Sequence, residues 1–161
     1  AIERRDGPSS LVFSRQNLKH QQRSVEQIEA ISRGGYVLRD CDGLPDAIII
    51  ATGSEVEVAM AASEAEALEE VNIRVVSMPS TTQFDRQTRE YRESVLPPGV
   101  RARLVVEAAV SGGWYKYVGL DGSVIGMDTF GESAPAKELF AYFGFTVDKV
   151  VEAVKNLLKP D

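Results

Sequence analysis

The segment best suited to bind an anion is residues 14–17 (SRQN), which follows a short apolar run at residues 11–13 (LVF). The apolar run predicts a strand that leads into a connector, and ligands of parallel α/β sheets gather where strands end. Arg15 carries a permanently charged, planar guanidinium whose donors can hold two phosphate oxygens at once. Arg15 is therefore a candidate phosphate ligand, and a surface salt bridge is the alternative explanation.

The other reactive side chains lack the partners that catalysis requires. His20 is the only histidine, so the sequence supports neither a histidine metal cluster nor a Ser-His-Asp triad, and we interpret His20 as an exposed connector residue. Cys41, the only cysteine, lies between Asp40 and Asp42. Carboxylates raise the pKa of a neighbouring thiol, so Cys41 is predicted to be a poor nucleophile.

The turn at residues 52–54 (TGS), between a predicted strand and a predicted helix, could hold a phosphate at the N-terminus of the helix. However, Glu55 and Glu57 occupy the first turn of that helix, so we expect the protein to supply the anion itself. Ser54 and Glu57 also have the spacing of a capping box. The structural interpretation of this turn is therefore favoured over a phosphate site.

Glu107 follows the apolar residues 104–106 and is predicted to be a buried carboxylate with a shifted pKa. A hydrogen-bonded structural role is favoured over a catalytic one, because no partner is visible in the sequence. Residues 114–117 (WYKY) form an aromatic patch that is expected to pack in a core or an interface.

The hydrophobic pattern predicts strands that alternate with helices. The predicted strands are residues 11–13, 36–38, 47–51, 73–77, 104–106 and 124–127. The predicted helices are residues 54–70 and 84–96, one from Pro135 to Gly144, and one that Thr146 caps. This order predicts an α/β fold, a three-layer α/β/α domain with a mostly parallel sheet of about five strands.

Composition limits the possible partners. The chain has 161 residues, which suits one domain with or without an appended segment, and its net charge is −6. Binding to nucleic acid or to an anionic membrane is not expected, because both require a positive surface. Residues 1–40 nevertheless carry a net charge of +2 and the remainder −8, which suggests two pieces of different origin. No run approaches the ~20 apolar residues of a membrane helix, no secretory signal is recognised, and the lone thiol favours a cytoplasmic location.

Seven ordered motifs resemble the end of a transketolase. They are SRQNL (14–18), GGYVL (34–38), IATGSEV (50–56), RVVSMPS (74–80), YRESVLP (91–97), WYKYVGL (114–120) and TFGESAP (129–135). The resemblance runs from about residue 8 to residue 158. Ala109 stands where the family pattern has glycine, and residues 111–113 replace a bulkier and more polar stretch, which leaves the shape of this loop open.

The resemblance implies a thiamine-diphosphate-dependent transferase of the pentose phosphate pathway. Such an enzyme moves a two-carbon ketol unit from a ketose phosphate to an aldose phosphate and works as a homodimer of three-domain subunits. Residues 1–28 would be the tail of the middle domain with its linker, and residues 29–161 the C-terminal domain. Arg15 matches the arginine that binds the sugar phosphate. The residues that bind thiamine diphosphate and its divalent metal, magnesium or calcium, would lie in the other domains, the N-terminal and middle ones.

Three hypotheses about this chain follow. The leading one is a fragment of a transketolase that is inactive alone, with no cofactor, metal or catalytic residue of its own. The second is a small-molecule-binding regulatory module of a related thiamine-dependent enzyme, and the third is a structural domain that supports the dimer.

Overall fold

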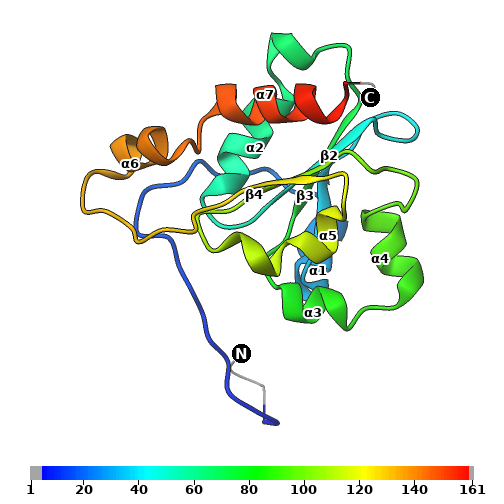
Figure 1. Cartoon of the computed structure of the whole chain (residues 1–161). Helices are drawn as coiled ribbons and strands as arrows, with labels where there is room; N and C mark the ends of the chain where they lie inside the picture. The colour runs from blue at the N-terminus through cyan, green and yellow to red at the C-terminus, as the bar shows by residue number, and fades with distance from the viewer. Residues whose placement is uncertain (1–4, 160–161) are drawn as a thin grey trace.

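Five strands form one sheet in the order β1-β3-β2-β4-β5 in this computed structural model, which describes residues 5–159 (Figure 1). The strands are β1 (Tyr36–Arg39), β2 (Ala47–Ala51), β3 (Ile73–Ser77), β4 (Arg103–Val106) and β5 (Ser123–Ile125). β2 pairs in parallel with β3 and β4, and β4 pairs in parallel with β5. Only β1 is antiparallel to its neighbour β3 among these five strands. The predicted α/β fold with a mostly parallel, five-stranded sheet is confirmed.

The central strands of the sheet are buried on both faces, which explains their largely apolar sequences. Every residue of β2 and of β3 is buried. Successive side chains point to opposite faces, so Ile49 joins one core cluster while Ile48 and Ile50 join the other.

Helices cover both faces of the sheet, as predicted. The helices are α1 (Val25–Ala30), α2 (Glu55–Ser63), α3 (Thr81–Asp85), α4 (Arg89–Val95), α5 (Tyr115–Val118), α6 (Ala136–Phe143) and α7 (Val147–Leu157). α2 and α7 pack against each other over one face, and α3, α4 and α5 contribute buried residues to the core of the other (Figure 1). No helix among residues 5–159 is long and apolar enough to cross a membrane.

Two predicted helices are shorter than their hydrophobic patterns suggested. The helix predicted over residues 54–70 ends at Ser63 and is followed by a separate 3-10 turn, Glu66–Leu68. The helix predicted over residues 84–96 is two helices, α3 and α4, because Thr88 begins a new helix by accepting the N–H of Tyr91 at 3.3 Å.

The N-terminal segment departs most from the prediction. Residues 11–13 are irregular rather than a strand, and the exposed fractions of Leu11, Val12 and Phe13 are 64%, 95% and 81%. In Figure 1 this segment runs away from the sheet, toward the N-terminal end of the trace. A strand requires a neighbour to satisfy its backbone groups, and no described strand lies beside these residues.

The first of the two C-terminal helices begins and ends at the predicted residues, and the second begins at its predicted cap. Gly144 ends α6 in the left-handed conformation, with φ of 84°. The Thr146 hydroxyl accepts the N–H of Lys149 at 3.3 Å and so caps α7. Phe145, between the two helices, is buried in the same core cluster as Val150.

Hydrogen bonds of Ser111 help to hold the loop after β4, whose shape the sequence left open. Ser111 is buried, and both its N–H and its hydroxyl donate to the carboxylate of Asp128, at 2.9 and 2.8 Å. This pair of hydrogen bonds ties the loop to the segment that follows β5.

Candidate functional site at the carboxyl edge of the sheet

The N-terminal segment crosses the edge of the sheet at which the parallel strands β2, β3 and β4 end. Its course is fixed by hydrogen bonds to the domain. The N–H of Lys19 donates to Glu57 of α2 at 3.2 Å, and the Arg23 guanidinium donates to the hydroxyl of Tyr36 at 2.7 Å. The segment therefore lies where ligands of open α/β sheets bind.

Helix α1, which the sequence did not predict, completes this attachment. It begins with a capping box in which Ser24 and Gln27 exchange hydrogen bonds. The Gln27 amide also donates to the carbonyl oxygens of Val37 and Leu38, at 3.0 and 2.8 Å. A side chain on α1 thus supplements the hydrogen bonding of the edge strand β1.

A cavity of about 460 Å³ separates the N-terminal segment from the turns that follow β2 and β3. Leu18, His20 and Arg23 line it from the segment, and Ser54 and Ser77 from the domain. His20 is exposed, as expected of a connector residue, although it also borders this cavity.

Arg15 is not held to this edge and does not line the cavity. Its side chain is exposed, and it forms no hydrogen bond or ion pair with any other residue of the described chain. The hydroxyl of the preceding residue, Ser14, lies 3.9 Å from the point where a Cβ on Gly53 would stand. The alternative explanation, a surface salt bridge, therefore has no partner among residues 5–159.

The predicted capping box at Ser54 is wrong. The N–H of Glu55 donates to the carbonyl of Thr52 at 3.2 Å, so the chain is already turning helically and Ser54 has φ and ψ of −69° and −28°. A capping side chain requires extended backbone at its own position. The Ser54 hydroxyl donates instead to the Glu55 carboxylate at 3.1 Å, and Glu57 accepts the N–H of Lys19.

Glu55 fills the N-terminus of α2, as the prediction of an internal anion requires. Only 3% of this residue is exposed. Burial raises the pKa of Glu55, while hydrogen bonds from its own N–H, from Ser54 and from the N–H of Ala108 act to lower it. An incoming phosphate would have to displace this carboxylate, so the turn at residues 52–54 is not an open phosphate site.

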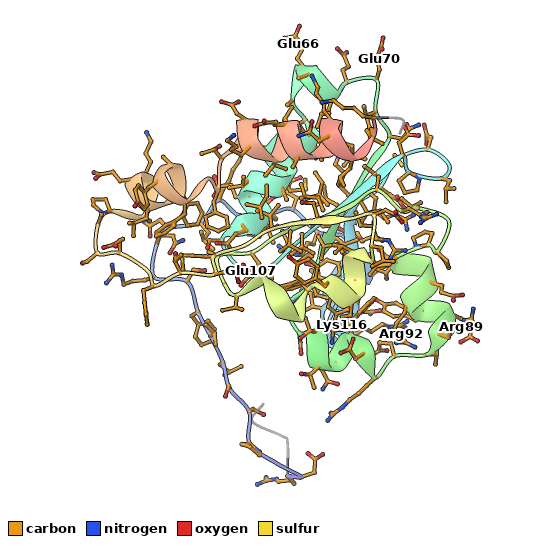
Figure 2. All side chains as sticks on the ribbon, viewed as in Figure 1. Glu66, Glu70, Arg89, Arg92, Glu107 and Lys116 are labelled. Atoms are coloured by element: carbon orange, nitrogen blue, oxygen red, sulfur yellow. The ribbon has the colours of Figure 1, made fainter. Side chains whose placement is uncertain are left out.

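Glu107 (Figure 2) directly follows β4, and its carboxylate is affected by the charge of Glu55. Burial, and secondarily the charge of Glu55, raise the pKa of Glu107 to about 7. Its Oε2 is buried and has no hydrogen-bond partner among the described residues, so the hydrogen-bonded role expected from the sequence fails at this atom. The predicted shift of the pKa is confirmed, and its partner, Glu55, is a residue that the sequence did not indicate for this role.

Glu107→Gln is expected to stabilise the protein at pH 8 by about 1–2 kcal/mol, after allowance for the part of the side chain that solvent still reaches. The unfolded chain loses this proton near the ordinary pKa of 4.5 and the folded chain near 7. The folded state therefore binds more protons between these values, and its stability falls as the pH rises through this window. Glutamine has no proton to lose.

Urea unfolding of both proteins at pH 5 and pH 8 measures this effect. Glu70→Gln, which removes an exposed carboxylate elsewhere (Figure 2), controls for the change in net charge. If Glu107→Gln gained no stability at pH 8 relative to pH 5, the buried, unpartnered carboxylate would not carry the cost that we assign to it.

Residues 5–159 do not fit a metal-bound diphosphate. No group of three or more His, Cys, Asp or Glu side chains within this range could hold a metal ion. Cys41 is not an activated thiol, because burial and then the charges of Asp40 and Asp46 raise its pKa. The predicted rise of the Cys41 pKa is confirmed. Burial is the largest cause, and the second carboxylate that contributes, after Asp40, is Asp46 and not Asp42.

Comparisons with known proteins agree over nearly the whole chain. Residues 34–146 match the family described as the transketolase-like TK C-terminal domain. A Vibrio vulnificus (strain YJ016) transketolase is 60% identical over 158 residues, which are 98% of this chain and 24% of that protein. The chain therefore spans about a quarter of the length of this relative.

Solved structures of transketolases share the fold. The enzyme from Leishmania mexicana is 43% identical with a TM-score of 0.80, over 91% of this chain and 21% of that one. A Pichia stipitis transketolase in complex with sedoheptulose-7-phosphate is 41% identical with a TM-score of 0.72, over 81% and 19%. A split gene transketolase, described as an inactive beta4 tetramer, is 26% identical with a TM-score of 0.58, over 79% and 43%.

Proposed function

The chain belongs to the transketolase C-terminal domain family, and on that premise we propose that it acts as the C-terminal part of a transketolase. Such an enzyme transfers a two-carbon ketol unit from a ketose phosphate to an aldose phosphate. The observation that carries the proposal is the 60% identity to a transketolase over 98% of the chain.

The proposed division places the tail of the middle domain and the linker at residues 1–28 and the C-terminal domain at residues 29–161. The exposed apolar side chains of Leu11, Val12 and Phe13 support it, because they have no core to join within the described chain and would gain one against a middle domain. The proposed boundary passes through α1, and α1 contacts β1. The end of the linker is therefore attached to the C-terminal domain.

Cofactor chemistry belongs, in this proposal, to the rest of the transketolase polypeptide. Thiamine diphosphate and a magnesium or calcium ion would be held there, because residues 5–159 do not fit them, and the whole enzyme would be a homodimer. The inactivity of the beta4 tetramer of the split gene transketolase supports this division of labour. The lone cysteine supports a cytoplasmic enzyme.

The contribution of this chain to the substrate site would be Arg15. Its guanidinium is exposed and free of internal partners within the described chain, so no ion pair must be broken before it binds a phosphate. The Pichia stipitis relative binds sedoheptulose-7-phosphate, a sugar phosphate of the kind that such an arginine would hold. In this role Arg15 orients the substrate by its phosphate end.

A chimera tests the proposed function. Residues of this chain replace the 158 matching residues of the Vibrio vulnificus transketolase, and ketol transfer between two sugar phosphates is measured with saturating cofactor. The chimera is expected to keep a kcat/KM within about tenfold of the parent, a loss of at most about 1.4 kcal/mol. A folded, dimeric chimera with no measurable transfer would contradict the proposal.

A further inference from the structure

A second cavity, of about 340 Å³, lies on the face of the sheet covered by α3, α4 and α5. Its volume is within the range of small-molecule sites. Six charged side chains line it: Arg89, Arg92, Arg103, Lys116, Asp85 and Glu93. Figure 2 labels Arg89, Arg92 and Lys116, which come from α4 and α5. None of the six residues borders the cavity beside the N-terminal segment.

Two of the four cations in this basic pocket are already paired. Arg89 forms an ion pair with Glu93 at 2.6 Å, one turn along α4. Lys116 forms an ion pair with Asp85, which also accepts the hydroxyl of Tyr117 at 2.8 Å. These pairs consume both carboxylates of the pocket.

Arg103 is a fixed cation at the base of the pocket. Its guanidinium is half-buried and donates to the carbonyl oxygens of Leu96, Pro97, Val100 and Tyr117 at 2.8–3.2 Å. These carbonyls hold the side chain rigidly, but they carry no net charge, and no carboxylate within residues 5–159 pairs with it.

Arg92 is the cation free to bind a ligand. Its side chain is exposed and has no hydrogen bond or ion pair within the described chain. Its charge reaches into the pocket: although burial acts to raise the pKa of Asp85, hydrogen bonds from Lys116 and Tyr117 and the charges of Lys116 and Arg92 hold it below its usual value.

We propose that this basic pocket binds the phosphate group of a small metabolite, with the Arg92 guanidinium as its principal ligand and Arg103 as the cation beneath it. The two unpaired guanidiniums leave an excess of two positive charges, which a phosphate dianion balances. The planar fork of Arg92 can donate to two phosphate oxygens at once. A long polyanion such as nucleic acid is disfavoured by the net charge of −6 on the chain as a whole.

Titration of the ¹⁵N-labelled chain tests the proposal. Inorganic phosphate or ribose 5-phosphate is added at pH 7.5, with the ionic strength held constant by sodium chloride. The amide signals of Arg92, Lys116 and Tyr117 are expected to shift and to saturate. Arg92→Gln should weaken this binding about tenfold or more, the usual effect of losing one charge-assisted hydrogen bond, and Arg92→Lys should weaken it less.

Two matched variants separate this pocket from other sources of a shift. Lys155→Gln removes one cation from α7, on the opposite face of the sheet, and Arg15→Gln removes the proposed substrate ligand. Both should keep the saturating shifts at Arg92. Tighter binding of ribose 5-phosphate than of inorganic phosphate would identify a sugar phosphate as the occupant, and equal binding would identify the free ion. Shifts that do not saturate, or an equal loss in Lys155→Gln, would overturn the proposal.

Discussion

The isolated 161-residue chain is expected to bind no thiamine diphosphate and to catalyse no ketol transfer, even with saturating cofactor and magnesium. Its described residues offer no cluster of metal-ligating side chains. The N-terminus of α2, at the carboxyl edge of the sheet, is filled by the buried carboxylate of Glu55. Calorimetric titration with thiamine diphosphate and magnesium measures the binding, and a coupled assay measures the transfer.

The complete Vibrio vulnificus transketolase, titrated under the same conditions, is the positive control. Glu55→Gln in the isolated chain is the informative variant, because it removes the carboxylate that would repel a diphosphate. A micromolar dissociation constant for the unaltered chain would contradict the assignment of cofactor binding to the rest of the polypeptide.

Arg15→Ala in the chimera is expected to lower kcat/KM for an aldose phosphate acceptor by about 10- to 100-fold. Hydrogen bonds to a charged group contribute about 1.5–3 kcal/mol, and the loss appears in full when the phosphate is left without its partner. Arg15→Lys should recover only part of the loss, because a single ammonium does not reproduce the two-point contact of a guanidinium. Steady-state kinetics at several acceptor concentrations give kcat/KM for both variants.

Unfolding of the isolated chain distinguishes this role from a structural one. Arg15 is exposed and forms no hydrogen bond or ion pair with the described residues that its removal would break. Arg15→Ala should therefore change the free energy of unfolding by no more than about 0.5 kcal/mol. A larger loss of stability would show that Arg15 holds the N-terminal segment in place.

The core of the fold was predictable because burial alone shapes it. Residues 47–51 and 104–106 are continuous apolar runs, and residues 73–77 are apolar except for Arg74 and Ser77. All three segments become strands covered on both faces. Gly144 and Thr146 also mark helix boundaries in the sequence, because the left-handed turn and the cap each favour a few residue types.

The predictions from sequence were wrong where a local pattern found no tertiary partner, or where another interaction took its place. Residues 11–13 have the composition of a strand, but no strand of the described chain lies beside them. Ser54 and Glu57 have capping-box spacing, yet the turn at Thr52 is already helical, and Glu57 is taken by Lys19. Helix α1 is short and has no buried residue, so hydrophobic periodicity did not reveal it.

The candidate site was predictable only in part for the same reason. The raised pKa of Glu107 follows from its place after a buried strand, but its pairing with Glu55 depends on β2 and β4 being neighbours. The register that sets Ala51 opposite Val106 is the signal that could have revealed the pair. The basic pocket is lined by residues of α3, α4, α5 and β4, and no residue spacing along the chain predicts that these elements meet.

The most direct test of phosphate binding by Arg15 compares two acceptors that differ only by a phosphate. The chimera and its Arg15→Ala variant are assayed with an aldose phosphate and with the same aldose lacking its phosphate. The substitution is expected to lower kcat/KM for the phosphorylated acceptor about 10- to 100-fold and to leave the value for the other acceptor nearly unchanged. Equal losses with both acceptors would contradict phosphate binding by Arg15, because Arg15 would then support the position of the domain and would not bind the phosphate.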